Sequence, residues 1–171
     1  LLKRAEQAFH VPAHGHVARW IDLRAEGIGV SREASELWNI LHEKLKAMNV
    51  LDAKIQAPVP GKKQSVDAVV RATGAFLSVN PDRRVLLLLD EADRFFEQDS
   101  RSDFEETRRL KQLMDETARR FKVVFAGLHN VLRMTERPNH PLAHFGEPIE
   151  IGPLRAADEV REAVGLIRRP M

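Results

Sequence analysis

Apolar residues recur three or four positions apart in several long segments, which is the spacing of a helix with one buried face. In residues 32–48 the apolar positions are Ala34, Leu37, Trp38, Leu41, Leu45 and Met48. The same spacing predicts further helices over residues 1–10, 104–121 and 155–168 and in the segment after Ser65. We expect Ser31 and Ser65 to cap two of these helices, because a serine oxygen accepts a hydrogen bond from a free helix amide.

One segment is apolar without any polar alternation. Residues 85–89 read Val-Leu-Leu-Leu-Leu, with a turn before them and acids after them. A short uninterrupted run of this kind is typical of a strand buried on both faces, as in a parallel sheet. Further strands are predicted at residues 16–23, 122–127 and 149–151. Strands that alternate with helices predict an α/β fold, here a three-layer αβα sandwich with a mainly parallel sheet.

The composition narrows the class of protein. The 171 residues are 43% hydrophobic and 30% charged, which excludes a disordered chain. No apolar run approaches the roughly 20 residues that cross a bilayer, so we expect a soluble, cytoplasmic protein with no membrane partner. There is no cysteine, which excludes disulfides and thiolate metal sites. The formal net charge of +2 is too small to support nucleic acid as a partner.

The motif that carries chemistry lies directly after the apolar strand. Asp90 and Glu91 follow residues 86–89, so a buried strand delivers two adjacent carboxylates at its carboxyl end. Ligands of open α/β sheets bind at that edge. The first carboxylate can hold Mg²⁺, which takes oxygen ligands, and the second can orient or deprotonate a water that attacks a phosphate. The structural alternative is that Asp90 caps a helix beginning at Glu91.

Four hydrophobic residues followed by Asp-Glu resemble the Walker B motif of P-loop NTPases. The next predicted strand ends near His129 and Asn130, and the segment from Phe125 to Asn130 looks like the sensor-1 region of AAA+ and STAND ATPases. The resemblance implies ATP as the ligand and Mg²⁺ as the cofactor. It places Asp90 on the metal, Glu91 on the attacking water and Asn130 at the γ-phosphate, with His129 as the alternative sensor. It also implies a nucleotide-dependent switch.

Two features of the later chain extend this resemblance. An arginine that completes a neighbour's site is common in oligomeric ATPases of this class, and we assign that role to Arg137, which implies a homo-oligomer. The alternative is an arginine on the surface. The strand at residues 149–151, the Pro-Leu turn and the final helix resemble the entry to a helical lid. We therefore expect residues 1–154 to belong to the ATPase core and residues 155–171 to begin the lid.

The phosphate-binding loop of these ATPases, GxxxxGK[ST], does not occur in the 171 residues. Gly61-Lys62-Lys63 is not such a loop, because Lys63 stands where Ser or Thr is needed and no predicted strand precedes it. We expect the loop and the first strand to precede Leu1, in which case residues 1–171 alone bind ATP poorly. The alternative is a non-catalytic interaction module, a scaffold or nucleic-acid-associated domain that has lost the loop.

Three other interpretations are weaker. Residues 90–93 read Asp-Glu-Ala-Asp, as in DEAD-box helicases, but their Ser-Ala-Thr segment is replaced here by Ala126-Gly127-Leu128. The histidines in residues 10–16 lack the closed set of about four ligands that zinc requires. Trp20 and Trp38 lie in apolar patterns, which favours a place in the core over base stacking.

Overall fold

The computed structural model describes residues 1–59, 62–127, 142 and 145. Within them, a sheet of three parallel strands has the order β1–β2–β3. The strands are β1 (His16–Asp22), β2 (Arg84–Asp90) and β3 (Phe121–Phe125). The helices are α1 (Leu2–Phe9), α2 (Leu37–Ala47), α3 (Lys63–Val79), α4 (Asp93–Asp99) and α5 (Glu105–Glu116). Short 3₁₀ turns are η1 (Pro12–His14), η2 (Ala34–Glu36) and η3 (Ser100–Ser102).

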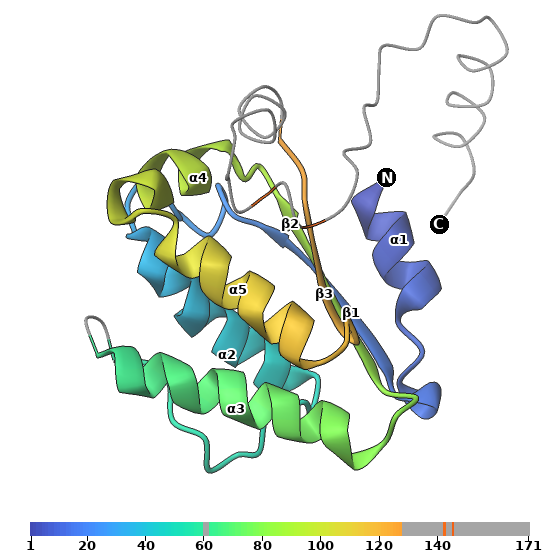
Figure 1. Cartoon of the computed structure of the whole chain (residues 1–171). Coiled ribbons are helices and arrows are strands. Elements are labelled where there is room, and N and C mark those ends of the chain that lie inside the picture. Colours follow the sequence, from blue (N-terminus) through green and yellow to red (C-terminus); the bar gives the residue numbers. More distant parts are fainter. Residues whose placement is uncertain (60–61, 128–141, 143–144, 146–171) are drawn as a thin grey trace, which may run out of the picture.

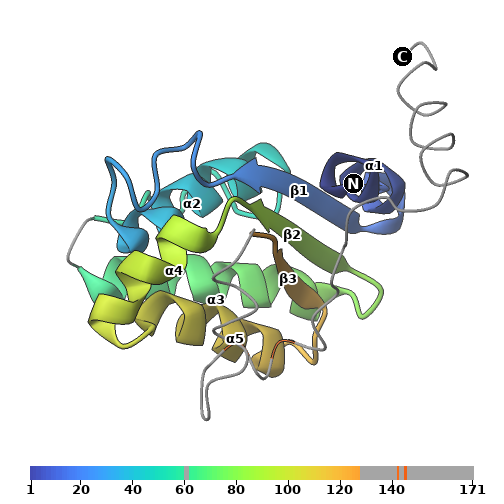
Figure 2. The same ribbon diagram turned by 90° about the horizontal axis from the view of Figure 1, so that it is seen from above.

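Helices lie on both sides of this sheet. Figure 1 shows α1 alone on one side, and α2, α3 and α5 together on the other. The view from above in Figure 2 gives the same separation, with α4 beside the carboxyl ends of the strands. The chain is therefore a mixed α/β protein with a parallel sheet, and its layers are compatible with the predicted αβα arrangement.

The central position of β2 explains its uninterrupted apolar sequence. It pairs in parallel with β1 along one edge and with β3 along the other. Leu87, Leu88 and Leu89 are all buried, so consecutive residues that point to opposite faces both lack contact with water. Of the apolar residues 85–89, only Leu86, near the amino end, is partly exposed. The prediction of a strand buried on both faces is confirmed for most of its length.

The larger core lies between the sheet and the three-helix layer. Alternate residues of each strand enter it: Val17, Ile21, Val85, Leu87, Leu89, Phe121 and Val123. They form one apolar cluster with residues of the three helices, including Trp38, Leu41, Val69, Leu77, Leu110 and Met114. The opposite face is covered less evenly, because Ala18 and Leu88 are buried there while Val124 is 40% exposed.

Both predicted serine caps are wrong. A capping box formed by Glu33 and Glu36 begins the second helical segment, where the Glu33 amide donates to Glu36 Oε1 at 3.2 Å. The next helix begins at Lys63, so Ser65 lies inside its first turn. There the Ser65 hydroxyl donates to Lys62 O at 2.6 Å and accepts from the Val59 amide at 2.9 Å. This serine therefore ties the preceding loop to the helix and does not start it.

The boundary between α5 and β3 also differs from the prediction. The spacing of apolar residues extended the helix to Phe121, but it ends at Glu116, and Ala118 and Arg119 adopt left-handed backbone conformations with φ of 49° and 59°. These two residues reverse the chain, so Phe121 begins the strand. The Thr117 hydroxyl stabilises the reversal, since it donates to Leu113 O at 2.7 Å and accepts from the Phe121 amide at 3.2 Å.

Helix α4 was not predicted as an element of its own. Its apolar content is a single adjacent pair, Phe95 and Phe96, which is too short to show helical periodicity. Both rings are buried and pack against Phe125 of β3, with ring centroids 6.0 and 4.7 Å away. The helix therefore depends on tertiary packing at the carboxyl edge of the sheet.

The strand predicted at residues 149–151 and the helix predicted at residues 155–168 lie outside the described residues. The proposed boundary between a core and a lid at residue 154 lies there as well. Among the residues that the structure does describe, no helix has the length and apolar character needed to span a membrane.

Candidate functional site

The carboxyl edge of the sheet brings together acids from two strands. Asp90 ends β2 and lies opposite Asp22, the last residue of β1, in the parallel register. The Leu23 amide donates to Asp90 O at 3.0 Å, so the backbone pairing continues to the end of both strands. The Asp22 carboxylate accepts the Ala25 amide at 2.9 Å and supports the turn that follows β1. The two carboxylates are therefore carried on rigid backbone.

The carboxylate of Asp90 is oriented by two hydrogen bonds. The Trp20 indole Nε1–H of β1 donates to Asp90 Oδ2 at 3.1 Å, and the Glu91 amide donates to Asp90 Oδ1 at 3.1 Å. Trp20 also makes a cation–π contact with α1, because Lys3 Nζ lies over its ring at 4.4 Å from the centroid. Each oxygen keeps a further lone pair, so the group can still accept from water or bind a cation.

Glu91 occupies a backbone conformation that non-glycine residues seldom adopt. Its φ is 54°, in the left-handed region, which costs about 1 kcal/mol for a residue with a Cβ. The chain turns sharply here and rejoins the sheet at once, since the Ala92 amide donates to Ala126 O at 2.9 Å and the Ala126 amide donates to Leu89 O at 2.8 Å. The backbone therefore leaves the line of the strand at Glu91, one residue after Asp90.

The structural alternative for Asp90 is not observed. No helix begins at Glu91, because its positive φ is incompatible with a right-handed helix. Helix α4 starts two residues later, and no side chain caps its first turn. Asp90 therefore does not serve as an N-cap, and its hydrogen-bond partners are its own neighbour and an indole from another strand.

The carboxylates at this edge suit a cation whose other ligands come from water and from a bound substrate. The part of the chain that the structure describes contains no cluster of three or more His, Asp or Glu side chains able to hold a metal by themselves. Mg²⁺ does not need one, because it is commonly bound through one or two carboxylates, several waters and substrate phosphates. Asp90 would supply such a carboxylate, with Asp22 near enough in register to hold a coordinated water.

The other residues implied by the resemblance are not placed. His129, Asn130 and Arg137 lie outside the described residues, so their roles stay predictions. The residue that follows β3, Ala126, is nevertheless described and lies beside Asp90 and Glu91, because it is hydrogen-bonded to both Leu89 and Ala92. The strand that was expected to carry the sensor is thus the direct neighbour of the strand that carries Asp90 and Glu91.

The weaker motifs also have structural explanations. Among the described histidines, His10 accepts the Ala18 amide on Nδ1 at 3.1 Å and so closes the outer edge of β1. Lys62 occupies the N-cap position of α3, and the described segment before it, residues 48–59, contains no strand, while Gly61 lies outside the described residues. Trp38 is buried as predicted, whereas Trp20 is only partly buried and donates a hydrogen bond to Asp90.

Sequence reasoning missed Trp20 and Asp22 as members of this edge. Asp22 had a weaker form of the signal of Asp90, an acid near the end of a predicted strand, and could have been found. Trp20 had no such signal, because its partner Asp90 is 70 positions away in the sequence. Its contact depends on the register between β1 and β2, which no local pattern encodes.

A second pair of buried carboxylates belongs to α4 and α5. Asp99 accepts the amides of Glu106 and Thr107 at 3.1 and 2.9 Å, and the Thr107 hydroxyl at 2.6 Å, so it caps the start of α5. Glu106 Oε2 accepts the Trp38 indole N–H at 2.6 Å. Burial raises the pKa of Glu106 above 4.5, and this effect outweighs the opposing effects of Trp38 and Arg109.

Glu106→Gln is expected to increase the free energy of unfolding by about 1 kcal/mol at about pH 8. The folded state binds the Glu106 proton more tightly than the unfolded state does. The contribution of Glu106 to the free energy of unfolding is therefore fully present below pH 4.5 and is lost as the pH rises through its raised pKa. Glutamine still accepts from Trp38 but carries no charge. Denaturant unfolding at several pH values measures the difference, which should vanish in acid.

The control for this prediction is Glu116→Gln. Glu116 is exposed and accepts Gln112 Nε2 at the end of the same helix, so its neutralisation should change stability by less than about 0.5 kcal/mol at any pH. A Glu106→Gln protein that is less stable than the wild type at about pH 8 would contradict the direction of the pKa shift.

Compared with models of known protein families, with characterised proteins and with solved structures, the chain shows no match. The function of the carboxyl edge is therefore argued from its residues and their geometry alone.

Proposed function

We propose that Asp90 and Glu91 are the acidic pair of a Mg²⁺-dependent ATPase of the AAA+/STAND type. One observation carries the proposal: two adjacent carboxylates at the end of a buried central strand are held in different ways. Asp90 is fixed by two hydrogen bonds, and Glu91 lies in a turn with a left-handed backbone conformation. Strain of this kind at the carboxyl edge of a parallel sheet is typical of functional sites.

The two carboxylates would perform different steps. Asp90 would hold Mg²⁺, which, when bound, would offset charge on the phosphates. Its orientation by Trp20 keeps both oxygens in place during turnover. Glu91 would accept a proton from the water that attacks the γ-phosphate, or orient that water. The bond that forms joins the water oxygen to the γ-phosphorus, and the bond that breaks joins the γ-phosphorus to the oxygen that bridges it to the β-phosphate and leaves on ADP.

The proposal requires a phosphate-binding loop in the same protein. GxxxxGK[ST] is absent from residues 1–171, so the loop would have to be supplied by a part of the protein outside them. Asn130 or His129 would sense the γ-phosphate, and Arg137 would complete the site of a second copy. ATP binding and hydrolysis would then switch the protein between two states.

The experiment that tests this function is phosphate release from ATP by the full-length protein that contains these residues, with and without Mg²⁺. Hydrolysis that stops when Mg²⁺ is chelated is expected. A protein that neither binds nor hydrolyses ATP would contradict the proposal and favour a non-catalytic interaction module.

Trp20→Phe is expected to raise the Mg²⁺ concentration for half-maximal hydrolysis by about tenfold, because loss of a hydrogen bond that orients a metal-binding carboxylate typically weakens metal affinity by 10- to 100-fold, roughly. Phenylalanine keeps the apolar ring under Lys3 but cannot donate to Asp90 Oδ2. The rate at saturating Mg²⁺ should change far less. Hydrolysis measured across a Mg²⁺ titration separates these two effects.

Trp38→Phe is the matched control, since it removes the other indole N–H of the chain, which donates to Glu106 in the core. This variant should lose thermal stability but keep the wild-type Mg²⁺ requirement. Equal shifts in the two variants would show that Trp20 acts through stability and not through Asp90.

A further inference from the structure

The first turn of α1 is connected to the acidic edge of the sheet through one side chain. Lys3 Nζ lies over the Trp20 ring of β1 at 4.4 Å from its centroid, and the Trp20 indole N–H donates to Asp90 Oδ2 at 3.1 Å. In Figure 1, α1 runs back along the sheet from the start of β1, which brings its first turn toward the carboxyl ends of the strands. Side chains of α1, β1 and β2 therefore form a row that ends on the carboxylate assigned to Mg²⁺.

The strand register explains why these side chains meet. Trp20 is the partner of Leu88, and Asp90 lies two residues beyond Leu88 on the same strand, so Trp20 and Asp90 point to the same face of the sheet. That face carries α1 and none of the other described helices of the main layer (Figure 2). Lys3 thus covers the indole from the side of α1, while the N–H of the same ring is bonded to Asp90.

Contacts farther along α1 place Lys3 over the indole. The helix contains no buried residue, so its position on the sheet depends on partly exposed contacts. Glu6 Oε1 lies 3.7 Å from Arg19 Nη1 of β1. The Phe9 ring stacks on the His16 ring, with centroids 5.5 Å apart. These contacts hold the middle and the end of α1 on β1, and the Lys3 contact holds its first turn.

A cation over an indole affects the hydrogen bond that the indole donates. The positive charge is attracted to the negative face of the ring, which favours one orientation of the side chain. It also polarises the ring, which makes the N–H a stronger donor. Trp20 is only partly buried, whereas Trp38 is 1% exposed, so packing holds Trp20 less firmly. The orientation of Trp20, and with it the bond to Asp90, therefore depends on Lys3.

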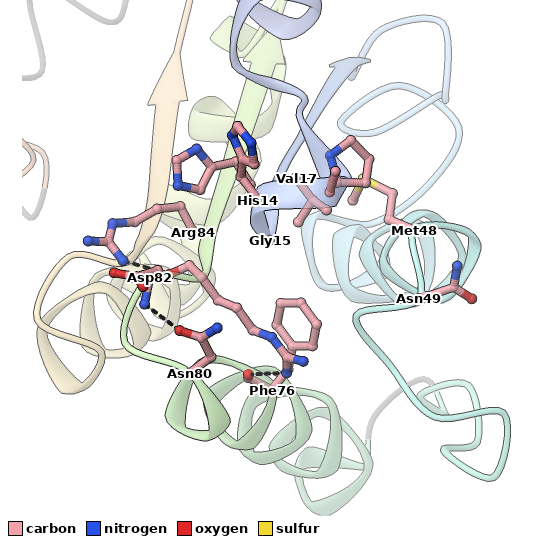
Figure 3. Close-up of a pocket in the computed structure, with 13 residues that line it drawn as sticks. His14, Gly15, Val17, Met48, Asn49, Phe76, Asn80, Asp82 and Arg84 are labelled. Atoms are coloured by element: carbon pink, nitrogen blue, oxygen red, sulfur yellow. Dashed lines mark hydrogen bonds between the residues drawn. The ribbon is translucent and has the colours of Figure 1, made fainter.

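A second cation–π contact of the chain lacks this property. The Arg83 guanidinium lies 4.4 Å from the centroid of the Phe76 ring, in a cavity at the amino ends of the strands (Figure 3). The Phe76 ring has no polar atom, so it cannot pass the effect of the charge to a further group. Lys3, in contrast, lies over a ring that is itself a hydrogen-bond donor to a carboxylate.

We propose that Lys3 is a positioning residue for Asp90, which it keeps oriented for Mg²⁺ through the Trp20 indole. The proposal rests on the function proposed above, in which Asp90 holds the metal. Lys3 contacts neither the metal nor the nucleotide, and its charge acts through the indole. Because such coupling is reciprocal, Mg²⁺ at Asp90 also stabilises the first turn of α1 on the sheet.

Exchange of the Trp20 indole N–H with solvent tests the proposal without any need for ATP hydrolysis. It is followed by NMR of the ¹⁵N-labelled full-length protein without nucleotide, and the Trp20 signal is identified by its loss in Trp20→Phe. Lys3→Met keeps an apolar stem but removes the charge, and it should speed this exchange by about two- to fivefold, the factor that an exposed cation–π contact contributes. Lys3→Arg keeps a cation and should restore the wild-type rate. The Trp38 indole, bonded to Glu106, is the reference in the same spectra and should not change.

The Mg²⁺ requirement gives the second measurement. In hydrolysis assays, Lys3→Met should raise the Mg²⁺ concentration for half-maximal rate by about two- to fivefold and leave the rate at saturating Mg²⁺ unchanged. Arg4→Met is the matched control, because Arg4 is the next residue of the same helix and is also exposed. It should change neither the Mg²⁺ requirement nor the exchange of the Trp20 indole.

Three results would overturn the proposal: an unchanged indole exchange rate in a folded Lys3→Met protein, the same change in Arg4→Met, or no recovery in Lys3→Arg. Faster exchange with an unchanged Mg²⁺ requirement in an active enzyme would also overturn it, because Trp20 then has no effect on metal binding. A protein that hydrolyses no ATP contradicts the proposed function instead, and the exchange rates still decide whether Lys3 holds the indole on Asp90. Circular dichroism shows that each variant is folded.

Discussion

Glu91→Gln in the full-length protein is expected to reduce ATP hydrolysis by about 10²- to 10⁴-fold while ATP binding is retained. Glutamine has nearly the same size and can occupy the same turn, but it cannot take a proton from the attacking water. Asp90 keeps both of its hydrogen bonds, because one comes from the backbone of residue 91 and the other from Trp20. The metal should therefore bind as before, and only the chemical step should slow.

Phosphate release and nucleotide binding have to be measured together for this variant. Glu97→Gln is the matched control: Glu97 lies on α4, close in sequence, and is paired at 2.7 Å with Arg94 on the surface. Its hydrolysis rate should stay within about twofold of the wild type. If Glu91→Gln hydrolyses ATP at the wild-type rate, Glu91 is not the catalytic carboxylate.

Asp99→Ala is expected to lower the free energy of unfolding by about 3 kcal/mol. Asp99 is 1% exposed and satisfies two backbone amides and one hydroxyl at the start of α5. Alanine would leave these buried donors without a partner. Each unsatisfied donor costs about 1–3 kcal/mol of stability, and relaxation of the surrounding residues recovers part of that cost. The change would also loosen α4, whose phenylalanines pack against Phe125 of β3.

Denaturant unfolding of the variant gives the magnitude of this effect. Asp52→Ala is the control, since Asp52 also accepts a backbone amide, that of Lys54 at 2.8 Å, but does so in an exposed loop where water can replace it. It should cost about 0.5 kcal/mol or less. A loss below about 1 kcal/mol for Asp99→Ala would mean that water or neighbouring groups satisfy the same amides.

The elements with the strongest local patterns were predicted well. The apolar run before Asp90 is the central strand, and residues 1–10, 32–48 and the segment after Ser65 contain helices. Element ends were predicted less well, because they depend on hydrogen bonds that spacing does not reveal. Thr117, for instance, follows the last residue of α5 and stabilises the start of β3 through its hydroxyl. The predicted helix ran past it to Phe121.

Part of the candidate site could likewise be predicted from the sequence and part could not. Asp90 and Glu91 could be identified from the sequence, because an apolar strand that ends in two acids is a local pattern. Asp22 carried a similar pattern that was not used. The left-handed conformation of Glu91 had no local signal, because glutamate does not favour it; the hydrogen bonds of Ala92 and Ala126 impose it. Asn130, His129 and Arg137 stay predictions.

By itself, the sequence determined the alternation of strands and helices, the burial of residues 87–89 and the acidic end of that strand, since each follows from neighbours within a few positions. Only the tertiary structure decided which strands are adjacent. That order brings the Trp20 indole to Asp90 across 70 positions of sequence. The physical reason is that backbone pairing sets the register, and the register decides which distant side chains meet.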